Sequence, residues 1–233
     1  MLRGYGIIAA GGSGKRMGAD VPKQLLELDG ISIFERSLRP FIRCPEIEGI
    51  VIVAEADIFE HINEVVDGIS DNTKSISVVK GGVERQDSVR NGLEAVPEDV
   101  DVVVIHDAVR PFITAGLISE CVRSAFDNGA VCVMRPLKET LKVVSDSIVR
   151  ETLDRSKLWI AQTPQAFGRK LLLKAHQNAV AKNITGTDDS MLVELLGKPV
   201  HVIEGSDMNI KITTPVDLKI AAAVLAMFTK LED

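Results

Sequence analysis

Runs of consecutive apolar, mostly β-branched residues are the feature that most constrains how this chain can fold. Residues 50–53, 102–105 and 131–134 contain no charged side chain. Strands of this kind are typical of parallel sheets, in which helices cover both faces. Amphipathic helical patterns separate them, near residues 33–42, 59–66, 86–96 and 117–126. The alternation predicts an α/β fold with a doubly wound, mostly parallel sheet and helices on both faces.

Residues 136–160 break this alternation because they contain no helical pattern. Residues 140–144 and 148–153 have the composition of two extended segments, joined by a turn at 145–147. We therefore expect a β-arm that stands off a single domain formed by residues 1–233. Since an isolated two-stranded ribbon is marginally stable in water, we expect the arm to pack on another surface, such as a second subunit.

Near the C-terminus, polar Asn209, Lys211 and Thr213 alternate with isoleucines. This alternation predicts a strand that carries the three polar side chains on one face. The last helix is predicted to begin at Thr214, which has the side chain of a helix cap.

The overall charge excludes some classes of function. The 233 residues carry a net charge of −6, which argues against a nucleic-acid groove. No apolar run is long enough to span a membrane, and the apolar patch near the N-terminus is too short for a signal peptide. Three cysteines, far apart and without ligand spacing, predict buried free thiols in a reducing cytoplasm.

The first apolar run ends in a loop rich in glycine and cations. It contains Gly11, Gly12, Gly14, Lys15, Arg16 and, shortly after, Lys23. Glycines allow backbone amides to approach an anion, and three cations suit a polyphosphate. The loop is not a Walker motif, because Arg16 follows Lys15, and it lacks the third glycine of the dinucleotide fingerprint. A plain turn explains the glycines alone; the cations favour nucleotide binding.

A second candidate site follows the apolar run at 102–105, at the carboxyl end of a predicted strand, where α/β sheets bind ligands. Asp107 is a hard oxygen ligand suited to a Mg²⁺ ion that bridges phosphates. Arg110 could pair with Asp107 or with a phosphate. We interpret His106 as structural.

The remaining polar segments have simple structural explanations. Gly82, Arg85 and Ser88 could contact the edge of a nucleotide base, although this segment taken alone favours a plain turn and helix start. Solvation, a turn or helix capping accounts for Thr140, Arg155, Thr163 and Thr187. No Ser-His-Asp or Cys-His pair indicates a covalent nucleophile. A phosphate cradle and a metal carboxylate together suggest direct attack of a phosphate oxygen on the α-phosphorus of a nucleotide, with loss of pyrophosphate.

Taken in order, these motifs resemble those of the 2-C-methyl-D-erythritol 4-phosphate cytidylyltransferases, a family of sugar-phosphate nucleotidyltransferases. The resemblance runs from about residue 5 to about residue 220. It rests on residues 9–18, 22–24, 81–89, 106–111, 140–142, 152–155, 162–165, 187–189 and 209–213.

The resemblance implies a role for each matching residue. Cations that bind the triphosphate and stabilise the transition state would be Lys15, Arg16, Lys23 and Lys211. The cytidine nucleotide would be surrounded by Ala10, Gly11, Gly12, Gly82, Arg85, Ser88 and Asp107. The acceptor would contact Asp107, Arg110, Thr140, Arg155, Thr163 and Thr187. Asp107 would also hold Mg²⁺ or another hard divalent cation. Thr140 and Arg155 would reach the acceptor from the arm of a partner, which implies a homodimer with shared sites.

Three alternatives remain at this stage. The ribitol 5-phosphate cytidylyltransferases share the glycine loop, residues 22–24 and residues 106–112, but the arm motifs at 140–142 and 152–155 favour the methylerythritol enzymes. A regulatory module that binds nucleotide without turnover would usually lack the metal carboxylate or a cradle cation. An NAD-dependent oxidoreductase is disfavoured by the missing fingerprint.

Overall fold

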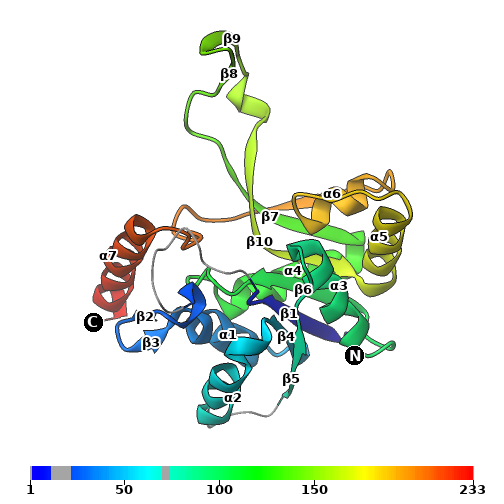
Figure 1. The fold of residues 1–233 in the computed structure, drawn as a ribbon, viewed down its shortest axis with the longest axis vertical. Coiled ribbons are helices and arrows are strands. Elements are labelled where there is room, and N and C mark those ends of the chain that lie inside the picture. Colours follow the sequence, from blue (N-terminus) through cyan, green and yellow to red (C-terminus); the bar gives the residue numbers. More distant parts are fainter. Residues whose placement is uncertain (1, 12–21, 70–73, 233) are drawn as a thin grey trace.

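The computed structural model describes residues 2–11, 22–69 and 74–232, and the structural statements below refer to these residues (Figure 1). They contain a seven-stranded sheet in the spatial order β11-β7-β10-β6-β1-β4-β5. Its strands are β1 (Gly4–Ala9), β4 (Ile47–Ala54), β5 (Ser75–Lys80), β6 (Val102–Asp107), β7 (Ala130–Pro136), β10 (Trp159–Gly168) and β11 (His201–Glu204). All neighbouring pairs are parallel except those of β10, which runs antiparallel to β6 and β7. The predicted doubly wound, mostly parallel sheet is confirmed.

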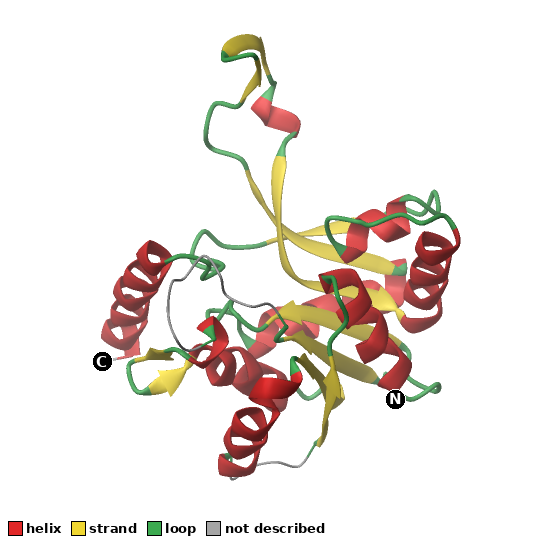
Figure 2. Cartoon of the chain, viewed as in Figure 1, coloured by secondary structure: helices red, strands yellow, loops and turns green. Residues whose placement is uncertain are grey.

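Helices cover both faces of this sheet (Figure 2). They are α1 (Ile33–Arg43), α2 (Phe59–Gly68), α3 (Arg85–Ala95), α4 (Ala115–Asn128), α5 (Arg169–Ala181), α6 (Asp189–Glu194) and α7 (Pro215–Glu232). Successive side chains of β1 enter opposite cores: Ile7 joins the cluster that contains Leu93 of α3, whereas Ile8 joins the cluster that contains Phe41 of α1. The fully apolar strands are required because each strand buries both of its faces.

The predicted β-arm is present and stands off the body of the molecule (Figure 1). It carries a separate two-stranded antiparallel sheet of β8 (Lys142–Ser145) and β9 (Ile148–Thr152). Asp146 and Ser147 form its turn, and both have φ in the left-handed region, as tight hairpin turns require. A short 3₁₀ turn at Arg155–Lys157 leads back towards β10.

The strand predicted from Asn209 to Thr213 is wrong, because this segment has no regular secondary structure. Its alternation has another origin. The Asn209 side chain is buried and makes hydrogen bonds, Ile212 is buried, and the Ile212 amide donates one hydrogen bond to the Val109 carbonyl at 2.9 Å. One backbone bond ties the segment to the turn after β6, where a strand would need a ladder of such bonds.

Other sequence predictions concern the environment of the chain. Cys44, Cys121 and Cys132 are buried and unpaired, as predicted. Among the helices of the described segments, none has both the length and the apolar composition needed to cross a bilayer.

Candidate active site

The carboxyl ends of β1 and β6 form the floor of the site. The two strands are parallel neighbours, so that Ala9 pairs with Asp107 at their ends. Gln24, in the short 3₁₀ turn Lys23–Leu25, donates a hydrogen bond from Nε2 to the Ala10 carbonyl at 2.8 Å and so brings Lys23 over this edge. The topology therefore places the loop after β1 and the carboxylate after β6 side by side, as open α/β sheets generally do.

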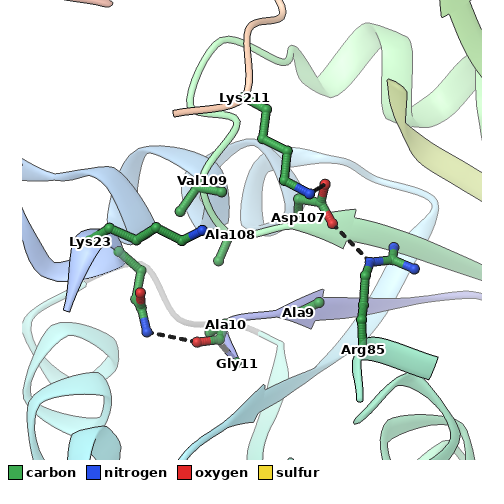
Figure 3. Close-up of a pocket in the computed structure, with 10 residues that line it drawn as sticks. Ala9, Ala10, Gly11, Lys23, Arg85, Asp107, Ala108, Val109 and Lys211 are labelled. Carbon is green, nitrogen blue, oxygen red and sulfur yellow. Dashed lines mark hydrogen bonds and ion pairs between the residues drawn. The ribbon is translucent and has the colours of Figure 1, made fainter. Parts of the chain in front are cut away.

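Three adjoining cavities lie over this edge. A central cavity of about 180 Å³ is lined by Ala9, Ala10, Gly11, Lys23, Gln24, Arg85, Asp107, Ala108, Val109 and Lys211 (Figure 3). A second, of about 330 Å³, is lined by Ala9, Gly11, Glu55, Gly82, Val83, Glu84, Arg85 and Ser88. A third, of about 220 Å³, is lined by Arg85, Asp107, Arg110, Ala161, Gln162, Thr163, Gln165, Thr187, Asp188 and Lys211. Arg85 borders all three, and Asp107 and Lys211 are shared by the first and third.

Asp107 is the electrostatic centre of this arrangement. Its carboxylate is almost fully buried and lies 2.8 Å from Lys211 Nζ, 3.2 Å from Arg85 Nε and 3.5 Å from Arg110 Nε. Burial alone would raise the pKa of Asp107, but the charges of the three cations outweigh burial and hold its pKa well below the usual range. The group is therefore an anion at any physiological pH.

His106 connects the neighbouring residues by a chain of hydrogen bonds. Its Nε2 lies 3.1 Å from the Arg110 carbonyl, which can only accept, so Nε2 carries the proton. Nδ1 therefore accepts from the Thr163 hydroxyl at 2.9 Å, and the same hydroxyl oxygen accepts from the Asp107 amide at 3.1 Å. Burial lowers the pKa of His106 to about 4, which keeps the ring neutral. The structural interpretation of His106 agrees with this geometry.

Arg110 and Thr163 are both bonded to Asn209, and Gln162 lies next to Thr163 in the chain; sequence reasoning selected neither of these two buried amide residues. Arg110 Nη1 donates to the Asn209 carbonyl at 2.7 Å, and Asn209 Nδ2 donates to the Thr163 carbonyl at 2.9 Å. Gln162 Nε2 donates to the Ser206 carbonyl at 2.8 Å. No local pattern marks these residues as a group, because they meet only when β10 and the segment after β11 lie together.

The second cavity is shaped by the turn before α3. The Gly82 amide donates to Ser88 Oγ at 3.0 Å, and Ser88 Oγ donates to the Glu84 carbonyl at 3.1 Å. A side chain at position 82 would place its Cβ only 2.3 Å from Asp87 Cβ, so the turn requires glycine. Val83 also lines this cavity and is 95% exposed.

The remaining predicted site residues fall in different places. Thr187 lines the third cavity but does not cap α6, since Asp188 is the cap and accepts from the Met191 amide at 2.9 Å. Thr140 and Arg155 are exposed on the arm and line none of the three cavities. Gly12, Lys15 and Arg16 lie outside the described residues.

Asp189 is a further buried group that sequence reasoning did not select. Its Oδ2 accepts from Arg85 Nη1 at 2.7 Å, across 104 positions of sequence. Burial alone would raise the pKa of Asp189, but the interactions with Arg85 and with His176 together outweigh burial and lower it.

The donor set at this edge fits a metal ion bound mainly by substrate. Within residues 2–11, 22–69 and 74–232, no three His, Cys, Asp or Glu side chains gather as a ready metal cage. Asp107 nevertheless offers an anionic oxygen ligand in the central cavity. One protein carboxylate, completed by phosphate oxygens and water, is a common arrangement for Mg²⁺.

Comparison with known proteins identifies the family. The family model of 2-C-methyl-D-erythritol 4-phosphate cytidylyltransferase (IspD) matches residues 5–227. The enzyme of that name from Syntrophotalea carbinolica is 47% identical over 223 residues, which are 95% of each chain. The one from Geobacter metallireducens is 44% identical over 224 residues, covering 95% of this chain and 97% of the relative.

Solved structures agree. The crystal structure of 4-diphosphocytidyl-2C-methyl-D-erythritol synthase from Anaerococcus prevotii superposes with a TM-score of 0.86 at 32% identity, covering 97% of this chain and 96% of that one. The chain therefore belongs to the 2-C-methyl-D-erythritol 4-phosphate cytidylyltransferase family, whose reaction transfers the cytidylyl group of CTP to 2-C-methyl-D-erythritol 4-phosphate in the non-mevalonate pathway.

Proposed function

We propose that the three adjoining cavities form one active site, in which the family reaction takes place over Asp107. CTP would occupy the second cavity with its base against Gly82 and Ser88, and its phosphates would enter the central cavity. The acceptor phosphate would occupy the third cavity, near Arg110 and Thr163. The main support is that the Asp107 carboxylate, with its cations, lies where the first and third cavities meet.

In this arrangement the chain aligns two anions and neutralises charge. An oxygen of the acceptor phosphate attacks the α-phosphorus of CTP; the new P–O bond forms as the bond to pyrophosphate breaks. Lys23 and Lys211 line the central cavity, where they would stabilise negative charge that grows on the transferring and leaving phosphates. We assign the same role to Lys15 and Arg16. Ala10, Gly11 and Gly12 would bring backbone close to the nucleotide.

Mg²⁺, or another hard divalent cation, would be held by Asp107. When bound, it would neutralise charge on the phosphates and favour the departure of pyrophosphate. Arg85 and Lys211 now contact this carboxylate, so at least one of them would move to substrate or to another partner when the cation binds.

The arm supplies the remaining contacts if the enzyme is a homodimer. It exposes large apolar side chains to solvent, namely Leu141, Val143, Val144, Ile148 and Val149. Apolar groups gathered on a marginally stable ribbon favour burial against a second copy. Thr140 and Arg155, exposed on the same arm, would then meet the acceptor in the site of the partner. We further propose that residues 1–233 act as a single domain in the cytoplasm, which three buried free cysteines suit.

Pyrophosphate release tests this proposal. With CTP and Mg²⁺, we expect fast turnover with 2-C-methyl-D-erythritol 4-phosphate and little with ribitol 5-phosphate. Chelation of the divalent cation should abolish turnover. Equal rates with both acceptors would contradict the assignment of the third cavity, and undiminished turnover in chelator would contradict the role of Asp107 as a metal ligand.

A further inference from the structure

Arg85 joins two carboxylates that come from different parts of the chain. Its Nε donates to Asp107 Oδ1 at 3.2 Å, and its Nη1 donates to Asp189 Oδ2 at 2.7 Å. Arg85 lines all three cavities, whereas Asp189 lines none of them and is 1% exposed. The side chain of Asp189 therefore reaches the site through the guanidinium of Arg85, and its contact with Arg85 is shorter than that of Asp107.

The surroundings fix this second carboxylate in place. His176 Nε2, on α5, lies 3.3 Å from Asp189 Oδ1 and is equally buried. Gln86, next to Arg85, ties the first turn of α3 to the loop that leads to α6: its Nε2 donates to the Ile184 carbonyl at 3.1 Å and its Oε1 accepts from the Gly186 amide at 2.7 Å. Because these hydrogen bonds hold the first turn of α3 against the loop that leads to α6, Arg85 and Asp189 are kept facing each other.

The charges explain what a second carboxylate contributes. Asp107 alone would face three cations: Lys211, Arg85 and Arg110. A divalent cation that binds the Asp107 carboxylate must compete with these cationic side chains. Once bound, it repels the guanidinium of Arg85 electrostatically. If Asp107 were its only carboxylate, Arg85, whose side chain is only 30% exposed, would be left partly desolvated and without a counter-charge on leaving it, at a cost in free energy. A second, inaccessible carboxylate removes that cost, because Arg85 can leave Asp107 without losing its counter-charge.

On the basis of the proposed function, we propose that Asp189 is a positioning residue that retains Arg85 when a divalent cation occupies Asp107. Asp189 thereby lowers the free-energy cost of replacing the Arg85–Asp107 ion pair with a bond between Asp107 and the metal. Its effect is on the metal-bound state of the nucleotide site.

Calorimetry of CTP binding, without acceptor, separates this role from a general structural one. Affinity is measured once in EDTA and once in saturating Mg²⁺. Asp189→Asn keeps the side-chain shape and removes the charge, so we expect CTP affinity in EDTA to stay within about twofold of wild type. In Mg²⁺ the CTP affinity of this variant should fall by on the order of tenfold, because Arg85, without the charge of Asp189, keeps its ion pair with Asp107 and competes with the metal. Equal losses in both buffers would overturn the proposal.

Arg85→Gln provides a second, independent test, which also applies if Asp189→Asn does not fold. It removes the competitor, so the gain in CTP affinity on adding Mg²⁺ should be at least as large as in wild type. In this background Asp189→Asn should cause no further loss of the Mg²⁺ gain. A smaller gain in Arg85→Gln, or the same loss from Asp189→Asn in both backgrounds, would show that Asp189 does not act through Arg85.

Two further variants complete the design. Glu46→Gln removes another largely buried, ion-paired carboxylate, bound to Arg123 and Ser119 away from the cavities, and should leave the Mg²⁺ gain unchanged. Loss of the gain in this control would overturn the proposal as well. Asp107→Asn should abolish the gain. If it does not, the metal assignment under the proposed function fails, whatever the result for Asp189.

Discussion

The floor of the site and the arm differ in which side chains they expose to solvent. On the floor, Asp107 and His106 are buried, and each has partners supplied by the same chain. On the arm, the apolar side chains of Val144 and Ile148 are 58% and 55% exposed. Thr140 and Arg155, to which the family resemblance gives a role in acceptor binding, are exposed there as well.

This difference distinguishes a region whose charges are paired within one chain from a region whose apolar surface stays exposed. Buried charges must be paired within the chain, since an unpaired one would destabilise the fold by several kcal/mol. The floor is therefore preorganised for phosphates. The arm lacks such pairing, and its exposed apolar area indicates that it is completed by another molecule. Variants of the floor should change chemistry or folding, whereas variants of the arm should change acceptor binding or assembly.

The largest effect is expected for Lys23→Ala. This lysine lines the central cavity, where a cation matched to developing charge acts mainly in the transition state, so kcat should fall on the order of 10²-fold or more. Steady-state kinetics with saturating CTP and acceptor measure this. Lys170→Ala, which removes an exposed lysine from α5, is the matched control and should keep wild-type kcat. An unchanged kcat in Lys23→Ala would contradict the assignment of the floor.

His106→Gln tests whether the floor is held by its hydrogen-bond chain. The glutamine amide can still donate to the Arg110 carbonyl, but the acceptor for the Thr163 hydroxyl is lost. Burial lowers the pKa of His106 from 6.5 to about 4, so between these values the unfolded chain binds a proton that the folded chain does not. The wild type should therefore lose about 2 kcal/mol of stability between pH 7 and pH 5 that the variant does not lose. Denaturant unfolding in metal-free buffer measures this; parallel pH profiles would show that His106 is not held neutral.

Arg155→Ala tests the arm. The KM for the acceptor should rise on the order of tenfold, because a guanidinium–phosphate contact is lost, while CTP affinity stays nearly unchanged. Mixing this variant with Lys23→Ala sharpens the comparison. If the arm of one subunit serves the site of its partner, exchange between the two defective dimers should restore about a quarter of wild-type activity. No recovery after subunit exchange would place the arm over its own site.

The smallest effect is expected for Val144→Ser at the tip of the arm. Loss of exposed apolar surface should weaken dimerisation by roughly fivefold, about 1 kcal/mol, without changing the thermal stability of the monomer. Sedimentation equilibrium measures the dissociation constant. Val180→Ser removes a similarly exposed valine, 54% against 58%, from α5 and should not affect assembly. Equal effects of the two variants would mean that the arm is not the interface.

Much of the fold could be predicted from local pattern. The apolar runs at 50–53, 102–105 and 131–134 lie within β4, β6 and β7, and the interrupted alternation marks the arm. The prediction failed at residues 209–213, where a period of two arises from a buried amide and one backbone bond to Val109. Side-chain alternation reports burial, and only pairing with a neighbour makes a strand.

The sequence by itself determined which chemical groups this protein has: a glycine loop with cations, one carboxylate after an apolar strand, and an extended arm that carries Thr140 and Arg155. It also determined where strands and helices alternate, because periodicity is a local property of the chain. Only the tertiary structure decided that Arg85 shares its charge between Asp107 and Asp189, 104 residues from Arg85, and that Asn209 fixes Arg110. Such partners are chosen by the packing of distant elements and by the need to pair every buried charge, neither of which leaves a local pattern in the sequence.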